Sequence, residues 1–193
     1  MAENLAPDYK GQIDNKMWIT KKCRMNTESR LLSNATFLNI SNIYYSIIIS
    51  IISIISIITN DNTYSIISVI LSVALIISIT FATSLNYKER AEKMKRNYLD
   101  INELETKLKY IDPNSKDEIK TIELEYNKLL DNVENHLEYD YYRVLKNNKD
   151  VDFQGQIKTK YYLHGLLVLL FRIAIIILPI VTIVLTFILN NES

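Results

Sequence analysis

Two apolar segments separated by a short polar turn constrain the fold of this chain more than any other feature. Residues 43–59 are almost entirely Ile and Ser, residues 64–85 are mainly Ile, Ser, Val and Leu, and neither segment contains a charged residue. Uncharged apolar runs of about 18 residues or more are typical of membrane-spanning helices. Because a lone hairpin of strands would leave unpaired edges in lipid, we predict a transmembrane helical hairpin, with helices over about 37–59 and 64–85 and a turn at 60–63.

A third apolar segment covers residues 161–189 and contains Arg172 and Pro179. At about 1.5 Å per residue, this segment is longer than the roughly 30 Å hydrocarbon core of a membrane requires. Either the helix is tilted, or its membrane-spanning part is residues 173–189 and Arg172 lies at the inner surface. Both interpretations predict a third transmembrane helix over 161–193, ending in a short outer tail.

The residues before the first span predict an amphipathic helix. We expect residues 1–13 to be flexible and Asp14 to cap the helix that follows. Trp18, Met25 and Leu32 recur at intervals of seven residues, and basic side chains cover the other faces. Such a helix can lie on the membrane surface or pack against a polar helical bundle, and the pattern leaves both interpretations open.

Residues 86–146 have the pattern of an antiparallel helical hairpin outside the membrane. We expect its first helix to continue from the second span without a break and to end before a turn at residues 112–115, which contains Pro113. A second helix is expected over about 115–146, followed by a polar linker at 147–160. Apolar residues recur every three or four positions on the second helix and predict a face that is buried in assembly or in the hairpin core. This candidate face comprises Ile122, Tyr126, Leu129 and Val133.

The distribution of basic residues predicts the orientation of the chain in the membrane. The net charge is zero, but six Lys and Arg lie in residues 1–36 and fifteen in residues 86–160. The turn at 60–63 and the tail after residue 189 contain none. Because Lys and Arg are enriched on the cytoplasmic side of membrane proteins, we expect the N-terminus and residues 86–160 in the cytoplasm, and the turn and the C-terminus outside.

The sequence predicts no catalytic, cofactor or metal site. Cys23 is the only cysteine, which excludes an intrachain disulfide, and the three glycines are too scattered for a phosphate-binding loop. His136 and Asp140 have a spacing that suits two metal ligands on one helix, but a third ligand is lacking. The basic residues at 88–96 alternate with acidic ones, so orientation and anionic lipid explain them without nucleic-acid binding. We therefore expect a protein that is not an enzyme.

Polar side chains within the spans are the candidate lining of a pore. At about 100° per residue, the first span carries a continuous serine stripe flanked by asparagines, and the third carries an arginine and two threonines on one face. The candidate pore-lining residues are Ser46, Ser50, Ser53, Ser56, Arg172, Thr182 and Thr186. Small hydroxyl residues also permit close helix packing, but the length of the stripe favours a wall that faces water. For Arg172, snorkelling to headgroups, pore lining and pairing with an acid all remain open.

Several stretches of the sequence together resemble one protein family. They are Trp18, Lys22, Arg24 and Arg30-Leu31; Ser84-Leu85-Asn86-Tyr87-Lys88-Glu89-Arg90-Ala91 and Asn97-Tyr98; and Tyr126, Glu134-Asn135-His136 and Asp140-Tyr141. This pattern is similar to the SLATT family, the SMODS and SLOG-associating two-transmembrane effector domains of bacterial conflict systems, and most similar to subfamily five. The SLATT-like domain covers residues 14–146, and the third span is similar to C-terminal extensions of that subfamily.

The resemblance implies an all-α integral protein of the bacterial inner membrane that forms an oligomeric pore. Relatives are thought to be opened by a nucleotide signal or a partner protein and to arrest or kill an infected cell. The alternative is a non-conducting anchor or scaffold whose cytoplasmic hairpin docks a partner enzyme, such as a reverse-transcriptase-like protein. The expected partners are therefore membrane lipid, further copies of the chain, and an enzyme of that kind or one that makes a nucleotide signal.

Overall fold

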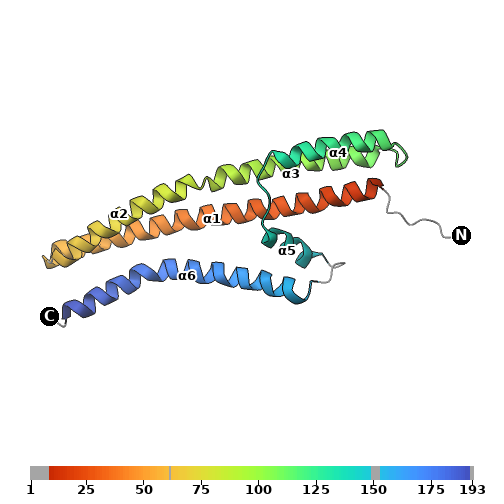
Figure 1. Ribbon diagram of the computed structural model, residues 1–193. Helices are drawn as coiled ribbons and strands as arrows, with labels where there is room; N and C mark the ends of the chain where they lie inside the picture. The colour runs from red at the N-terminus through yellow and green to blue at the C-terminus, as the bar shows by residue number, and fades with distance from the viewer. Residues whose placement is uncertain (1–8, 61, 149–152, 192–193) are drawn as a thin grey trace. The chain divides into compact units, whose positions relative to one another are not determined.

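Six helices make up the described part of the computed structural model, which covers residues 9–60, 62–148 and 153–191 (Figure 1). They are α1 (Tyr9–Thr59), α2 (Asn62–Ser84), α3 (Tyr87–Tyr110), α4 (Lys116–Asp131), α5 (Glu138–Asn147) and α6 (Gly155–Asn191). No strand occurs in these ranges, and the predicted all-α class is confirmed. The side chains of residues 186, 187 and 189–191 are outside the described set.

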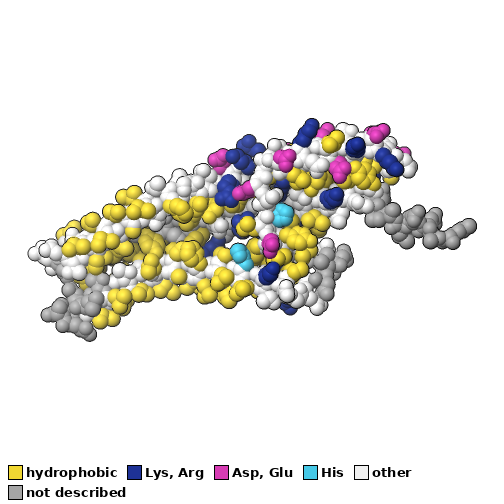
Figure 2. All heavy atoms as spheres, in the orientation of Figure 1, with side chains coloured by type: hydrophobic (Ala, Val, Ile, Leu, Met, Phe, Trp, Pro, Cys, Tyr) yellow, Lys and Arg dark blue, Asp and Glu magenta, His cyan; other side chains and the backbone are white. Residues whose placement is uncertain are grey.

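The chain divides into two compact units, and α1 and α6 each contribute to both. The polar unit comprises the described residues up to Leu32 together with Lys88–Tyr161. The apolar unit comprises Ser33–Tyr87 and the described residues from Tyr162 onward. Figure 2 shows hydrophobic side chains gathered over α2 and the later part of α6, and charged side chains gathered over α3 and α4.

Among the described residues, three helical segments are long and apolar enough to cross a membrane, as the sequence predicts. In each, only 6% of the most apolar 18-residue window is buried within the chain. Exposed apolar side chains on all sides of a helix are suited to lipid or to other membrane helices rather than to water. The chain is therefore an integral membrane protein.

Two asparagines in the left-handed conformation mark the ends of α2. Asn60 has φ 51° in the turn between α1 and α2, and Asn86 has φ 49° between α2 and α3. Asparagine adopts this conformation more readily than most residues with a side chain. The predicted continuity of the second span with the following helix is therefore wrong, because the helix stops at Ser84 and restarts at Tyr87.

The core of the polar unit is built from α1, α3 and α4. Its buried residues are Ile13, Met17, Ile101, Leu104, Leu108, Ile119, Ile122 and Tyr126. The prediction that residues 1–13 are flexible is therefore wrong for the last five, which form the first turn of α1 and bring Ile13 into this core. Residues 1–8 lie outside the described set. Of the two interpretations of the N-terminal helix, packing on the bundle is the one the structure shows.

The predicted helix over 115–146 is two helices, because α4 ends at Asp131 and α5 begins at Glu138. Asp140 interrupts the pattern, since its carboxylate accepts a hydrogen bond from the backbone N–H of Leu137 at 3.1 Å and so caps a new helix. The predicted linker at 147–160 is also shorter than expected. Helix α6 begins at Gly155, whose φ of 60° is easily adopted by glycine.

Candidate functional site

A buried ion pair attaches α5 to α1 in the polar unit. Asp140 is 1% exposed, and its carboxylate lies 2.8 Å from Nη2 and 3.1 Å from Nε of Arg30. The hydroxyl of Thr27 donates to the same carboxylate at 2.9 Å. The side-chain amide of Asn26 donates to the backbone carbonyl of Asp140 at 3.0 Å. Donors from four residues, counting the Leu137 N–H, thus bind Asp140, and replacing Asp140 would leave Arg30 without its carboxylate partner.

A buried cation, Arg24, lies at the C-terminal end of α4. The residue is 3% exposed, and its guanidinium donates to the carbonyls of Leu129 and Leu130 at 3.4 and 3.5 Å. The side-chain amide of Asn97 on α3 donates to the Leu129 carbonyl at 2.7 Å. The last carbonyls of a helix lack helical partners and carry partial negative charge, which favours a cation there. Burial lowers the pKa of Arg24, because removal from water disfavours the charged form. The carbonyl dipoles favour the cation and oppose this effect.

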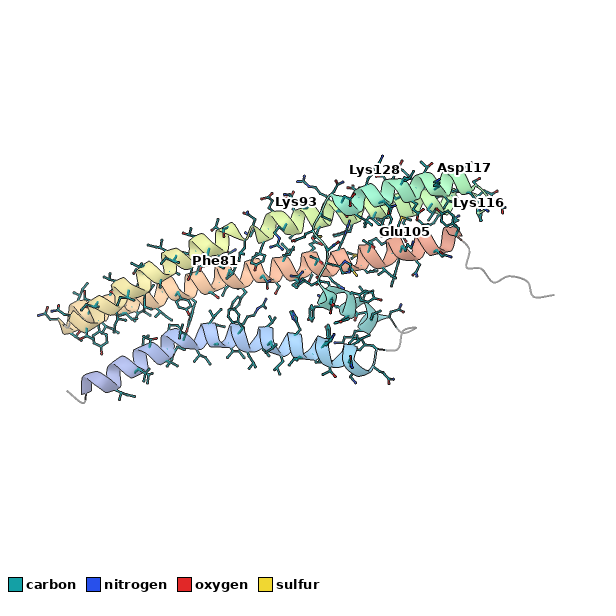
Figure 3. The ribbon with its side chains drawn as sticks, in the orientation of Figure 1. Phe81, Lys93, Glu105, Lys116, Asp117 and Lys128 are labelled. Carbon is teal, nitrogen blue, oxygen red and sulfur yellow. The ribbon has the colours of Figure 1, made fainter. Side chains whose placement is uncertain are left out.

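Further polar contacts join the same helices around their apolar core. Lys21 of α1 forms an ion pair with Glu105 of α3, which Figure 3 labels. The hydroxyls of Thr20 and Tyr126 lie 2.7 Å apart, which links α1 to α4. The Arg90 guanidinium of α3 contacts both oxygens of the Glu134 carboxylate, which follows α4, at 2.7 and 2.8 Å.

Seven of the residues that carry the family resemblance in the polar unit take part in these contacts. They are Arg24, Arg30, Arg90, Asn97, Tyr126, Glu134 and Asp140. Charged and amide side chains cannot be buried cheaply unless their partners are placed by other helices. These residues therefore specify how α1, α3, α4 and α5 pack against one another, rather than forming a reaction centre.

Burial shifts the pKa of two side chains of the kinds that can support catalysis. Burial raises the pKa of the Cys23 thiol to about 12, so the thiolate is scarce at neutral pH. Burial lowers the pKa of His136, which favours the neutral imidazole. Within the described ranges, no cluster of three or more His, Cys, Asp or Glu side chains is arranged to hold a metal ion.

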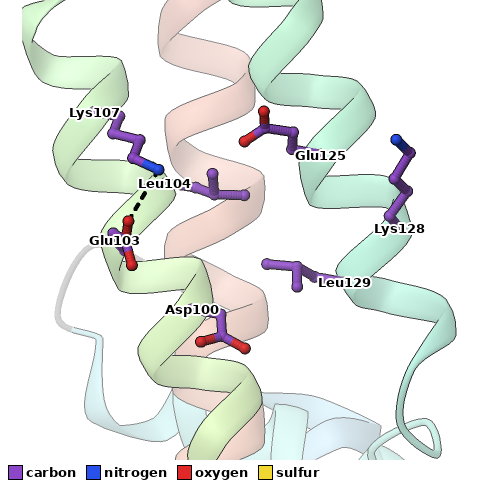
Figure 4. Close-up of a pocket in the computed structure, with 7 residues that line it drawn as sticks. All are labelled: Asp100, Glu103, Leu104, Lys107, Glu125, Lys128 and Leu129. Carbon is purple, nitrogen blue, oxygen red and sulfur yellow. Dashed lines mark ion pairs between the residues drawn. The ribbon is translucent and has the colours of Figure 1, made fainter.

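A shallow pocket between α3 and α4 gathers charged side chains of both signs. It is lined by Asp100, Glu103, Leu104, Lys107, Glu125, Lys128 and Leu129 (Figure 4). Glu103 and Lys107 form an ion pair at 2.9 Å, one turn apart on α3. Mixed charges of this kind are typical of solvated helix surfaces, where each ion pair contributes little to stability.

The predicted assembly face contributes mainly to the core of the polar unit. Ile122 and Tyr126 are 7% and 5% exposed, which leaves them little surface for another copy. Leu129 is partly buried and packs against the same core. Val133 lies after the end of α4. Packing within the unit thus explains the first three residues, and contact between copies through this face stays a prediction.

The serine stripe of α1 is largely uncovered. Ser46 and Ser50 are exposed, and Ser53 and Ser56 are half-buried. The hydroxyls of Ser46, Ser50 and Ser53 donate to α1 carbonyls four residues earlier, at 2.8 to 2.9 Å. These bonds satisfy each hydroxyl hydrogen within its own helix and leave oxygen lone pairs open to water or to another molecule. Two of these serines line a surface groove with Asn42, Ile43, Ile47, Ile51 and Ile54.

Arg172 contacts α1 on a different side from this stripe. Its Nη2 atom donates to the Asn34 side-chain oxygen at 2.9 Å and to the Ser33 hydroxyl at 3.2 Å. Its guanidinium lies 5.0 Å from the centre of the Phe37 ring. At about 100° per residue, these three α1 residues lie roughly 120–180° from Ser46. The two groups of candidate pore residues therefore do not share one wall within a single chain.

The structure says less about the other two candidate pore-lining residues of α6, Thr182 and Thr186. Thr182 is half-buried, and its hydroxyl donates to the Leu178 carbonyl at 3.0 Å. The side chain of Thr186 lies outside the described set.

A contact that sequence reasoning missed joins α1 to the proline of α6. Pro179 has no N–H, so the carbonyl of Ile175, four residues earlier, lacks its helical partner. The Tyr45 hydroxyl donates to that carbonyl at 2.7 Å, and the Tyr44 hydroxyl donates to the Ile176 carbonyl at 3.0 Å. The sequence signal was the proline itself, because a carbonyl orphaned in lipid requires a donor from another helix.

The chain matches a model of a known protein family. A model described as SMODS and SLOG-associating 2TM effector domain family 5 matches residues 7–188, almost the whole chain. No curated protein and no solved structure matches the chain.

Proposed function

Because this chain belongs to family 5 of the SLATT effector domains, we propose that it assembles into an oligomeric pore in the bacterial inner membrane. A nucleotide signal or a partner protein opens the pore during phage infection, and loss of the membrane barrier arrests or kills the cell. The family is one of membrane-type effector domains rather than enzymes.

The observation that carries the pore hypothesis is the uncovered serine stripe of α1. Ser46 and Ser50 face away from the other helices of the chain, in a groove that also includes Asn42. Lipid offers no hydrogen-bonding partner to such a stripe, whereas water in a pore offers many. Assembly of several copies around this face would place polar groups along a continuous wall.

The low burial of the spans supports assembly. Only 6% of each most apolar window is covered within one chain, so much surface is available for contacts with neighbouring copies. Membrane helices associate through close packing of small residues, and serine is one of these.

The polar unit is the proposed receiver of the opening signal. Its helices are held by buried ion pairs and carbonyl contacts, which have defined geometry and are costly to break singly. A ligand or partner that shifts α5 relative to α1 must disturb the Asp140 contacts, which gives the signal a discrete element to act on.

Ion flux from liposomes that contain only this protein tests the proposal. Replacing Ser46, Ser50 and Ser53 together by alanine removes polarity but keeps a small side chain, so the oligomer should persist while conductance falls. Replacing the same serines by asparagine should preserve conductance. If the stripe serves only packing, the order reverses, with alanine tolerated and asparagine disruptive. Replacing Ile48 and Ile55, which do not line the groove, by valine is the matched control.

A second candidate function is a non-conducting anchor that docks a partner enzyme on the polar unit. The observation that favours it is exposed apolar surface on α3 and α4, where Tyr110 is 88% and Leu124 54% exposed. Flux from protein-only liposomes separates the two candidates, because an anchor conducts nothing at any protein density. Retention of a purified reverse-transcriptase-like enzyme by the wild type, and its loss on Leu124→Glu, would favour the anchor.

A further inference from the structure

Three neighbouring side chains in the apolar unit retain unused hydrogen-bond donors. Arg172 donates only through Nη2, to Ser33 and Asn34, and its Nε and Nη1 atoms have no acceptor among the described residues. Asn34 accepts through its side-chain oxygen, which leaves its NH₂ group unpartnered in the same described set. Ser33 also accepts, so its own hydroxyl hydrogen is available. The cluster therefore gathers several unused N–H and O–H donors around one positive charge, a pattern suited to an anion.

The charge of this cluster is uncompensated. No carboxylate lies within ion-pair distance of Arg172 in the described ranges, and its guanidinium makes a cation–π contact with the Phe37 ring at 5.0 Å. The ring and the two hydrogen bonds fix the plane of the guanidinium. An arginine fixed in this way presents a fork of N–H groups that matches the oxygens of a phosphate.

The cluster lies where two spans begin. Its α1 residues, Ser33 and Asn34, directly precede the predicted first span at 37–59. On α6, Arg172 directly precedes the uncharged run 173–189, whose 17 residues extend about 25 Å at 1.5 Å per residue. That length is close to the hydrocarbon thickness of a membrane, so both helices place the cluster at headgroup depth.

We propose that Arg172, Ser33 and Asn34 bind the phosphate group of a membrane phospholipid and select lipids with a net negative headgroup. The preference for anionic lipids follows from the lack of a carboxylate near Arg172 in the described ranges. A zwitterionic lipid brings an ammonium or choline group that needs a negative partner, and the described cluster has none. A glycerol headgroup instead brings hydroxyls, which the Asn34 amide and the Ser33 hydroxyl can bind. The site does not depend on pore formation.

The test measures which lipids remain bound when the full chain is purified from an equimolar mixture of phosphatidylglycerol and phosphatidylcholine. The wild type should retain phosphatidylglycerol about five-fold over phosphatidylcholine, which corresponds to about 1 kcal/mol for one basic side chain near anionic headgroups. Arg172→Gln should abolish this preference. Asn34→Ala, which keeps the charge, should reduce it, and Arg172→Lys should fall between wild type and Arg172→Gln because lysine lacks the fork.

Lys120→Gln is the matched control for net charge, because Lys120 is exposed on α4 and belongs to the polar unit. It should retain the wild-type preference, and a loss equal to that of Arg172→Gln would overturn the site in favour of long-range attraction. Equal retention of phosphatidylglycerol by wild type and Arg172→Gln would also overturn it. Excess inorganic phosphate should not displace the bound lipid from the wild type. Displacement that depends on Arg172 would show that free phosphate, rather than a lipid, is the ligand.

Discussion

The contact between Tyr45 and the proline-bearing helix α6 permits a sharp test by mutation. In an α-helix each carbonyl accepts from the N–H four residues later, and Pro179 deprives the Ile175 carbonyl of that partner. The Tyr45 hydroxyl replaces it at 2.7 Å. Tyr45→Phe keeps the ring and removes only the hydroxyl, so the Ile175 carbonyl becomes unpaired in an apolar environment. We expect a cost of about 1–2 kcal/mol in the association of α1 with α6.

Pro179→Ala restores an N–H at the position that the Ile175 carbonyl requires. In that background Tyr45→Phe should cost about 0.5 kcal/mol or less, because the carbonyl has a helical partner again. The two substitutions are therefore coupled by about 1 kcal/mol in a double-mutant cycle. Tyr44→Phe is the matched control. Its acceptor, the Ile176 carbonyl, has a helical partner in Ile180 that retains its N–H, so its cost should not depend on residue 179.

Steric trapping measures the free energy of separating α1 from α6, with biotin attached to cysteines placed in the two helices of a Cys23→Ser chain. Equal costs of Tyr45→Phe with proline and with alanine at position 179 would refute the reasoning. Equal coupling of Tyr44 and Tyr45 to Pro179 would do so as well, because it would show that the hydroxyls act on packing in general.

Four further predictions concern the rest of the chain. Leu129→Asp places a charge against the packed core of the polar unit and should cost several kcal/mol; a thermal melt like that of the wild type would contradict it. Asp140→Asn breaks a buried ion pair and should destabilise the polar unit by about 3 kcal/mol in a denaturant titration; a change under about 1 kcal/mol would argue against a central role. Since burial raises the pKa of Cys23 to about 12, maleimide should label it at least about 100-fold more slowly in the native protein than in SDS. In a Cys23→Ser chain, a cysteine at Asn62 should react with an impermeant thiol reagent outside intact spheroplasts and one at Ser115 should not; the reverse would invert the predicted orientation.

The spans and the apolar core could be predicted because each rests on a strong and repeated physical signal. Uncharged runs long enough to cross lipid have few alternatives, and Ile119, Ile122 and Tyr126 follow a helical period into the core. Both signals sum over many residues. A single unusual position therefore does not change the prediction.

The interruption between α4 and α5 could not be predicted in the same way. Val133 and Leu137 keep a helical spacing across the break, so a count of apolar residues continues through it. The break depends on Asp140, whose carboxylate caps the new helix and binds Arg30, a residue 110 positions earlier. Local periodicity contains no information about a partner that distant. Only the resemblance to the family singled out both residues.

The polar contacts of the apolar unit could not be predicted from the sequence for a related reason. Tyrosines near the start of a span suggest an aromatic belt at the membrane surface. The sequence alone does not show which face of α1, the serine stripe or the opposite side, lies against α6. The α6 contact of Tyr45 depends on Pro179, which lies 134 positions after Tyr45 in the sequence. A search of the sequence for carbonyls that lose their helical partner to a proline would have predicted a donor for the Ile175 carbonyl.

The placement of α6 on α1 also separates two hypotheses that the sequence treated together. The α1 residues that contact α6 are Ser33, Asn34, Phe37, Tyr44 and Tyr45. At about 100° per residue, all five lie roughly 100–180° from Ser46, and the stripe from Ser46 to Ser53 faces the other way. If several copies turn this stripe toward a central pore, α6 must lie on the outer, lipid-facing side, with Arg172 among headgroups. If instead α6 lines the pore, the serines face lipid, where their bonds to their own helix keep them tolerable. A given assembly can satisfy only one of these arrangements. Arg172→Gln should therefore change lipid retention and leave conductance intact in the first, and change conductance in the second.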